Sequence, residues 1–281
     1  MIDSITIAFI GPGAMAEAML SGILKNKLTK ADRILISGPI PERNEELHAK
    51  YGVQPFSNNR EAAARADVVV LSVKPQRLEK VLEEMNGCIN PEALVLSIVA
   101  GASIAKIARN LGHDVIVRAM PNTPAQIGEG ITVWTCSKTV TEKQLDFAKT
   151  ILGAFGKEIF EEEEDFLDKA TALSGTGPAY VYLFMEAMVD AGVHLGFSRR
   201  TAERLVIETL RGSVDYYDTG AEDTRHLARL RNQVTSPGGT SAEAIYYLEK
   251  AGFRTAISRA VWAAYQRSRE LGQGIEGHTP D

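Results

Sequence analysis

The first half of the chain alternates short apolar runs with segments whose apolar residues recur every three or four positions. The apolar runs are rich in β-branched residues and show little polar alternation, which is typical of parallel strands covered on both faces. We predict strands at 5–10, 33–37, 68–73, 94–99, 115–118, 131–135 and 158–160. Helical periodicity separates them, for example at 15–25, 41–50, 60–65, 77–85 and 104–111. This alternation predicts right-handed crossovers and a Rossmann-like, doubly wound α/β sheet.

After the acidic run Glu161–Asp165 the pattern is helical throughout. We predict helices at 168–173, 179–195, 199–216, 224–232, 242–251 and 253–271. Ser198 is expected to cap a helix, and Gly252 and Gly272 to end two others. The expected domains are therefore a nucleotide-binding domain at 1–164, an all-α domain at 165–272 and a tail at 273–281. Because the helical domain is strongly apolar, we expect it to pack against a second copy of itself, giving a homo-oligomer.

Composition narrows the function classes. A net charge of −5 and the lack of a basic block argue against a nucleic-acid partner. Cys88 and Cys136 lie far apart and match no metal spacing, so we expect no metal site and a cytoplasmic, reducing environment. Met1 leads directly into a strand pattern with no signal peptide, and the longest apolar stretches are too short to cross a membrane.

The turn after the first predicted strand carries a nucleotide-binding signal. Gly11, Gly13 and Ala16 form the Gly-x-Gly-x-x-Ala version of the dinucleotide fingerprint. Gly11 would make the tight turn, and Gly13 would let a pyrophosphate approach the backbone. Ala14 and Met15 follow these glycines, where the helix 15–25 is predicted to start, and we include them in the cofactor site. An ordinary tight turn is the alternative interpretation.

The end of the second strand indicates which dinucleotide fits. An NAD site would carry an acid there to bind the ribose 2′-hydroxyl, but this chain has Ser37, followed by Arg43. A hydroxyl and a guanidinium favour a 2′-phosphate, so NADPH is the expected cofactor and NADH the alternative. The alternative for Arg43 is a solvated position on the helix that follows Pro41. Further cofactor-binding residues are expected where later strands end, at Val73, Lys74, Pro75, Ala100, Gly101 and Asn122.

A segment near the C-terminus, 234–244, combines four hydroxyl residues with a Pro-Gly-Gly turn ahead of an apolar helical pattern. Thr240 and Glu243 have capping-box spacing, so we predict a helix that begins here with Thr240 as its cap. The free N–H groups of its first turn would favour an anion, with the Ser241 hydroxyl beside them. A capped helix after a surface turn is the alternative.

Five motifs together resemble one family. Over residues 5–271 the chain is similar to pyrroline-5-carboxylate reductases. The motifs are Phe9–Ala16, Val73–Pro75, Met120–Pro124, Leu173–Tyr180 and Val234–Ser241. The resemblance implies an NADP(H)-binding N-terminal domain and a C-terminal helical domain that dimerises by intertwining, with decamers as a further assembly. It also implies reduction of the cyclic imine 1-pyrroline-5-carboxylate to L-proline, the last step of proline biosynthesis.

The resemblance also assigns site residues. The essential hydroxyl corresponds to Ser241, where the family usually has Thr. Substrate-binding residues are expected at Gly238, Gly239, Thr240, Ser174 and Gly177. Two further positions belong to the cofactor: Asn59 near the adenine ribose and Ser37 at the 2′-phosphate.

Two other functions remain open. A β-hydroxyacid dehydrogenase shares the two-domain plan, but it needs a general acid–base, usually a lysine in the first long helix of the second domain. The predicted helix 179–195 contains no lysine. A non-catalytic nucleotide-binding paralogue is the other alternative, because Asn232 and Ser241 depart from the family pattern and a fold does not fix a function.

Overall fold

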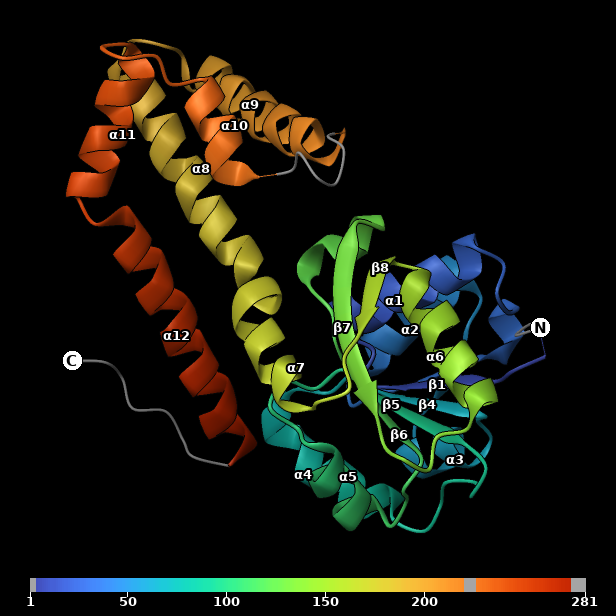
Figure 1. Ribbon diagram of the computed structural model, residues 1–281. Helices are drawn as coiled ribbons and strands as arrows, with labels where there is room; N and C mark the ends of the chain where they lie inside the picture. The colour runs from blue at the N-terminus through green and yellow to red at the C-terminus, as the bar shows by residue number, and fades with distance from the viewer. Residues whose placement is uncertain (1–3, 220–225, 274–281) are drawn as a thin grey trace. The chain divides into compact units, whose positions relative to one another are not determined.

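The computed structural model describes residues 4–219 and 226–273 and divides into two compact units (Figure 1). The sheet unit comprises Met1–Pro178 and Ala263–Asp281, and the helical unit comprises Ala179–Trp262. The expected tail lies outside the described residues from 274 onward, as do residues 224 and 225 of one predicted helix. The division into domains at 1–164 and 165–272 stays a prediction about folding units.

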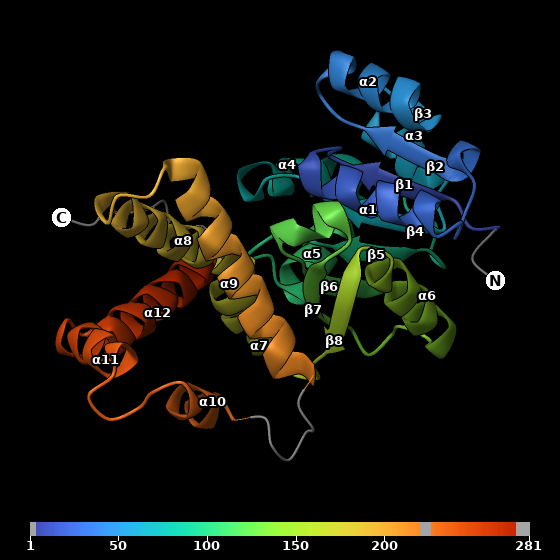
Figure 2. The same cartoon turned by 90° about the horizontal axis from the view of Figure 1, so that it is seen from above.

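An eight-stranded sheet forms the centre of the sheet unit, with β3 and β8 at its edges (Figure 2). The spatial order is β3-β2-β1-β4-β5-β6-β7-β8, and every pair is parallel except β6 and β7. The strands are β1 (Ile7–Ile10), β2 (Ile34–Ser37), β3 (Gln54–Phe56), β4 (Val68–Leu71), β5 (Leu94–Ser97), β6 (Ile116–Met120), β7 (Gly130–Cys136) and β8 (Gly156–Phe160). The predicted fold class is confirmed.

Two features of the sheet differ from the sequence-based expectation. The edge strand β3 was not predicted, because it is short, contains Pro55 and is largely exposed. The strand β7 runs antiparallel to β6 rather than parallel. Only a short connection with the 3-10 helix η2 (Thr123–Ile127) joins these strands. A parallel crossover needs about a dozen residues or more, so the chain must reverse here.

Helices cover both faces of the sheet because successive strand residues point to opposite sides. The helices are α1 (Ala14–Lys25), α2 (Pro41–Tyr51), α3 (Asn59–Ala64), α4 (Pro75–Met85), α5 (Ile104–Leu111), α6 (Glu142–Gly153) and α7 (Asp165–Ala170), with the 3-10 turn η1 (Ala31–Arg33) before β2. Phe9 belongs to the same core cluster as Met19 of α1 and Ile151 of α6 on one face. Ile10 belongs to the cluster on the other face, with Leu82 of α4 and Ile107 of α5.

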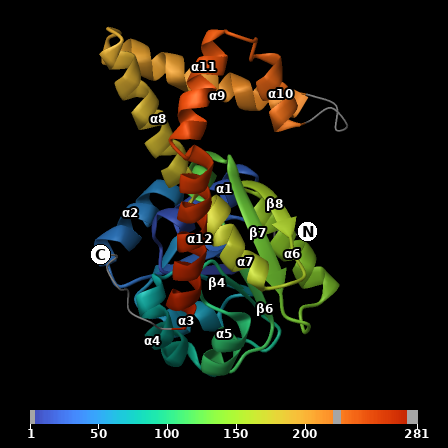
Figure 3. The same ribbon diagram turned by 60° about the vertical axis from the view of Figure 1, so that its left-hand side comes forward.

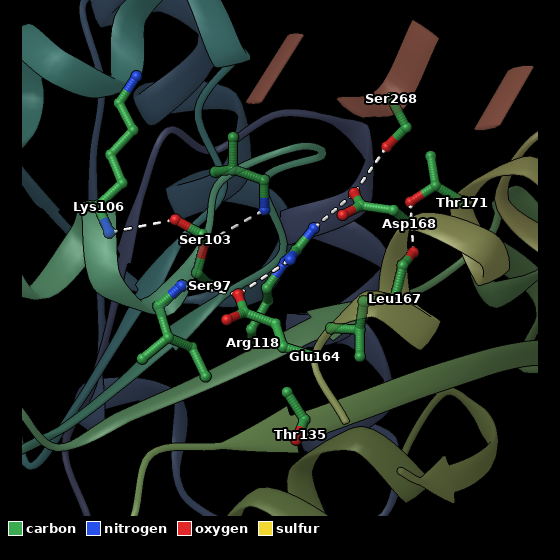
Figure 4. A network of polar contacts seen from close by, with 12 residues as sticks. Ser97, Ser103, Lys106, Arg118, Thr135, Glu164, Leu167, Asp168, Thr171 and Ser268 are labelled. Carbon is green, nitrogen blue, oxygen red and sulfur yellow. Dashed lines mark hydrogen bonds and ion pairs between the residues drawn. The ribbon is translucent and has the colours of Figure 1, made fainter. Parts of the chain in front are cut away.

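A buried arginine joins four elements of the sheet unit (Figure 4). Arg118 of β6 is only 3% exposed, and its Nη1 and Nη2 lie 2.9 Å from Glu164 Oε1 and Asp168 Oδ1. The backbone N–H of Ile104, at the start of α5, also donates to Glu164 at 2.8 Å. Ser268 Oγ donates to Asp168 at 2.9 Å from helix α12 (Phe253–Gly272), whose last turns therefore lie against α7 (Figure 3).

The helical unit contains α8 (Gly177–His194) from residue 179, α9 (Arg199–Thr219), α10 (Leu227–Gln233), α11 (Thr240–Lys250) and the first half of α12. The Ser198 hydroxyl accepts the N–H of Thr201 at 3.2 Å, which confirms the predicted cap of α9. The buried core of the helical unit is small and consists of Val189, Ala202 and Val206. Many large apolar side chains of this unit are exposed in the single chain, as a surface that associates with another subunit would be.

Candidate functional site

The glycine fingerprint lies at the turn between β1 and α1, where the sequence placed it. Gly11 has φ +92°, and its N–H donates to Ser37 O at 2.8 Å, which ties the turn to the end of β2. A Cβ on Gly11 would lie 2.7 Å from Val73 Cγ1, so a side chain is excluded. At Gly13 an added Cβ would meet nothing within 4 Å, so the backbone faces open space. Ala16 is fully buried against the sheet, as the fingerprint requires.

A cavity of about 730 Å³ opens beside this turn, at the carboxyl ends of β1, β2 and β4. This is the edge at which open α/β sheets bind ligands, and the volume suits a small-molecule or cofactor site. Its lining residues are Gly11, Pro12, Gly13, Ser37, Gly38, Pro39, Ile40, Arg43, Ser57, Asn59, Ser72, Val73, Lys74, Arg77, Lys80, Val81 and Glu84. A second cavity of about 720 Å³, near the C-terminal end of α1, is lined by none of the predicted site residues.

Seven of the predicted cofactor residues line the first cavity: Gly11, Gly13, Ser37, Arg43, Asn59, Val73 and Lys74. Ala14, Met15, Pro75, Ala100, Gly101 and Asn122 do not line it. Ala14 and Pro75 are the first residues of α1 and α4. The Asn122 side chain accepts the N–H of Ile131 at 3.0 Å and so fastens the start of β7.

Gly101, one of the predicted cofactor-binding residues that do not line the cavity, has a packing reason to be glycine. Its φ is +72°, and an added Cβ would lie 2.8 Å from the backbone nitrogen of Gly272 at the end of α12. The carbonyl oxygen of Ser268 would be 2.9 Å from the same Cβ. The turn after β5 and the C-terminal helix therefore touch through their backbones.

The guanidinium of Arg43, predicted to bind a 2′-phosphate, is already engaged by protein groups. Its Nε donates to Pro12 O at 3.2 Å, and its Nη1 donates to Glu46 at 2.7 Å. Its Nη2 forms a short ion pair with Glu17. Arg43 lines the cavity, but a phosphate would compete with two carboxylates for its donors.

Glu17 of α1 accepts hydrogen bonds from Arg43, Lys50 and Tyr51 and so forms the centre of a polar cluster. Burial raises the pKa of its carboxyl, but hydrogen bonds from Lys50 (2.7 Å), Arg43 and Tyr51 (2.9 Å) outweigh burial. Together they lower the pKa from 4.5 to about 2. The contact between Glu17 and Lys50 also raises the pKa of the lysine. The cluster fastens α2 to α1 beside the nucleotide cavity.

A second polar chain crosses the cavity wall from β2 to α4. Ser37 Oγ donates to Asn59 Oδ1 at 2.8 Å, and Asn59 Nδ2 donates to Glu84 Oε2 at 3.1 Å. Glu84, Arg77 and Lys80 also line the cavity and were not predicted as site residues from the sequence. Their spacing of three and four residues was a usable signal, because it places them on one face of a helix that starts at the ligand-binding edge.

The Pro-Gly-Gly segment forms the N-terminus of α11, but the predicted cap is wrong. The N-cap is Gly239, with no side-chain cap hydrogen bond, and Thr240 is the first helical residue. The Gly239 N–H donates to Ser236 O at 3.0 Å and closes the turn, so the helix begins one residue earlier than a Thr240 cap would require. The free backbone donors are consequently those of Thr240 and Ser241, the first two residues of the helix.

Ser174 lies in the sheet unit, on the π-helical turn η3 (Thr171–Gly175). Ser174 Oγ donates to Ala170 O at 3.0 Å. A Cβ on Gly175 would lie 2.7 Å from Met120 Cε, so this turn touches the end of β6. Two of the sequence motifs are thereby brought together, whereas Ser241 belongs to the helical unit. π-Helical turns are frequent at functional sites.

Across the described ranges, no helix has the length and apolar character needed to span a membrane. The same residues contain no group of three or more His, Cys, Asp or Glu side chains arranged to hold a metal ion. The first long helix of the helical unit, α8, contains no lysine. The general acid–base residue expected of a β-hydroxyacid dehydrogenase is therefore missing from this described helix.

Comparison with known proteins confirms the resemblance seen in the motifs. Residues 164–271 match the family "Pyrroline-5-carboxylate reductase dimerisation", and residues 6–101 match "NADP oxidoreductase coenzyme F420-dependent". The chain is 42% identical to pyrroline-5-carboxylate reductase of Synechocystis sp., over 96% of this chain and 99% of that protein. It is 36% identical to the Escherichia coli enzyme, over 94% and 97%. The crystal structure of Plasmodium falciparum pyrroline carboxylate reductase with NADP bound superposes with a TM-score of 0.88 at 33% identity, covering 97% of this chain and all of that one.

Proposed function

This chain belongs to the pyrroline-5-carboxylate reductase family, and from that premise we propose that it reduces 1-pyrroline-5-carboxylate to L-proline with NADPH, completing proline biosynthesis. NADH is the alternative hydride donor. The observation that carries the proposal is the full-length relationship to these reductases, combined with a cavity beside the glycine fingerprint. We further propose a cytoplasmic homodimer formed through the helical unit, with decamers as a higher assembly, in line with the match to a dimerisation family.

The cavity fits a dinucleotide. The backbone at Gly13 is open, and it leads into the N-terminus of α1, whose free N–H groups suit a pyrophosphate. Ala14 and Met15 would supply these amides. Ser37, Asn59, Arg77 and Lys80 would surround the adenosine ribose. Bound NADPH supplies the hydride that the imine carbon accepts.

The start of α11 has the groups needed for the substrate. We assign the substrate carboxylate to the N–H groups of Thr240 and Ser241, because anions are favoured at a helix N-terminus and the Gly239 N–H is already used within the turn. Gly238, with φ +70°, and Gly239 keep the turn free of side chains. Ser174 and Gly177 are proposed as further substrate contacts.

Ser241 is the proposed catalytic residue. Reduction adds a hydride to the imine carbon and leaves the ring nitrogen as an amine, so the nitrogen must be protonated. The Ser241 hydroxyl would hydrogen-bond the ring nitrogen, orient the imine and help deliver that proton. An iminium is already electrophilic, so placement of the substrate is the main task of the protein. In the proposed dimer the hydroxyl that completes a site comes from the partner chain.

Enzyme assays with an Ser241→Ala variant test this assignment. We expect kcat for pyrroline-5-carboxylate to fall about 100-fold, the scale of a lost proton-transfer group, while the Kd for NADPH is unchanged. Ser213→Ala is the control, because it removes an exposed helix hydroxyl of the same unit. Full activity of S241A would refute the role of Ser241. Activity of the parent protein with 3-hydroxyisobutyrate instead would favour a β-hydroxyacid dehydrogenase, and inactivity with both substrates would favour a nucleotide-binding paralogue.

A further inference from the structure

Glu84 is the one carboxylate among the described residues that line the nucleotide cavity. It lies on α4, one turn after Lys80 and two turns after Arg77, and both of these cations line the same cavity. Its neighbour Glu83 is exposed and does not line the cavity. The position of Glu84 is therefore unlike that of an ordinary surface charge on this helix.

The contact between Glu84 and Asn59 fixes the orientation of an amide. A carboxylate only accepts hydrogen bonds, so the amide must turn its Nδ2 toward Glu84, 3.1 Å away. The amide oxygen Oδ1 must then face Ser37, and it accepts the Ser37 hydroxyl hydrogen at 2.8 Å. Because that hydroxyl has one hydrogen, Ser37 has only its lone pairs left for a ligand.

These polarities distinguish the two forms of the adenosine ribose. A 2′-hydroxyl can donate to the free lone pair of Ser37, but an ionised 2′-phosphate carries acceptors only. A phosphate must therefore displace the hydrogen bond from Ser37 to Asn59, and it also meets the negative charge of Glu84. Arg77 and Lys80 act in the opposite direction, because their charges attract the phosphate. The guanidinium of Arg43 adds little, since Glu17 and Glu46 already bind it.

We propose that Glu84 determines cofactor specificity: it orients Asn59 and opposes a 2′-phosphate, so the site retains NADH as a hydride donor beside NADPH. This inference rests on the proposed function, because it concerns the cofactor of that reaction. In NAD sites an acid at the end of β2 favours the ribose 2′-hydroxyl, and we assign that role here to Glu84 of α4. Glu84 is a positioning residue toward Asn59 and a charge toward the ribose, and two substitutions separate these roles.

Calorimetric binding of two nucleotide fragments tests the proposal on the full chain without substrate. The fragments are 2′,5′-ADP, which carries the 2′-phosphate, and AMP, which carries the 2′-hydroxyl. Glu84→Gln keeps an acceptor for Asn59 and removes the charge, whereas Glu84→Leu removes both. Glu83→Gln is the matched control, because it makes the same charge change one residue away and outside the cavity.

For E84Q we expect the affinity ratio of 2′,5′-ADP to AMP to rise about fivefold, the scale of one partly screened charge, with AMP affinity within twofold of the parent. For E84L we expect AMP to bind at least threefold more weakly, because Asn59 is no longer held and Ser37 is no longer presented as an acceptor. E83Q should change neither quantity. An unchanged or lower ratio in E84Q, or an equal rise in E83Q, would overturn the proposal.

The ratio of kcat/KM for NADPH over NADH should follow the fragment ratio in E84Q. Since the fragments are bound without substrate, their ratio does not depend on the role of Ser241 or on the identity of the imine. Failure of the proposed reduction would leave the fragment measurements interpretable. Failure of the fragment measurements would leave the proposed reduction standing.

Discussion

Replacing Arg118 with methionine should destabilise the sheet unit more than any single surface substitution. Methionine keeps much of the length of the side chain but removes the charge and both hydrogen bonds to Glu164 and Asp168. Because Arg118 is only 3% exposed, water cannot readily replace those hydrogen bonds. Two carboxylates that faced a cation would then face an apolar side chain.

The magnitude follows from the exposure of each partner. A net hydrogen bond to a charged group contributes about 1.5–3 kcal/mol. The Asp168 side chain is 17% exposed and takes the full value, whereas Glu164 is 33% exposed and solvent screening reduces its share. Each carboxylate keeps one other donor: Glu164 keeps the Ile104 N–H, and Asp168 keeps the Ser268 hydroxyl. We therefore expect a loss of about 3 kcal/mol, at the lower end of the 3–5 kcal/mol typical of a broken buried pair.

Urea denaturation at a fixed protein concentration measures this loss, because unfolding of an oligomer depends on concentration. In thermal unfolding the same loss should lower the Tm by about 6–12 °C, because each kcal/mol corresponds to about 2–4 °C for a chain of roughly this size. Arg109→Met, at an exposed position on α5, is the control and should change the free energy of unfolding by less than about 0.5 kcal/mol. A loss below about 1 kcal/mol in R118M would mean that the ion pairs of Arg118 with Glu164 and Asp168 do not stabilise the fold. So would strict additivity with Asp168→Asn, because contacting residues should show coupling.

Three further changes test other parts of the sheet unit. Gly101→Ala should destabilise by more than about 1 kcal/mol in thermal unfolding, because φ +72° disfavours a side chain and its Cβ would press on the backbone of Gly272. Glu17 has a folded pKa of about 2 against an ordinary 4.5, so its contribution to stability is complete above about pH 4.5 and is lost as the pH falls toward 2. Denaturation of Glu17→Gln across this range should show a weaker pH dependence than the parent. Thr141→Ala removes the capping box of α6 and should cost about 1 kcal/mol in urea denaturation.

Each of these has a contradicting result. An unchanged Tm in G101A would mean that α12 does not approach the turn after β5. An identical pH dependence in E17Q would mean that its ion pairs do not form. Equal stability of T141A and of Thr150→Ala, whose hydroxyl only bonds back to its own helix at 2.7 Å, would remove the cap as a stabilising feature.

The sequence predicted the elements near the nucleotide site well because their signals are local. The fingerprint at Gly11 and Gly13 and the apolar runs of the strands depend on neighbours along the chain, and both were found in place. Capping-box spacing is also local and predicts Thr240 as the cap of α11, yet the Ser236–Gly239 turn makes Gly239 the N-cap and Thr240 the first helical residue. The sequence Pro-Gly-Gly-Thr is compatible with more than one backbone conformation, so the spacing alone does not determine which residue caps the helix.

The sequence by itself determined the fold class, the family and the edge of the sheet at which a nucleotide would bind. Hydrophobic periodicity and glycine placement are enough for these, because each is set by backbone geometry within one element or turn. Only the tertiary structure decided the partners of the charged residues. It engaged Arg43 with Glu17, buried Arg118 among carboxylates from α7, and set Glu84 against Asn59. These contacts join residues that are 25 to 50 positions apart and lie on different elements, so a charge pattern along the sequence cannot show which pairs meet.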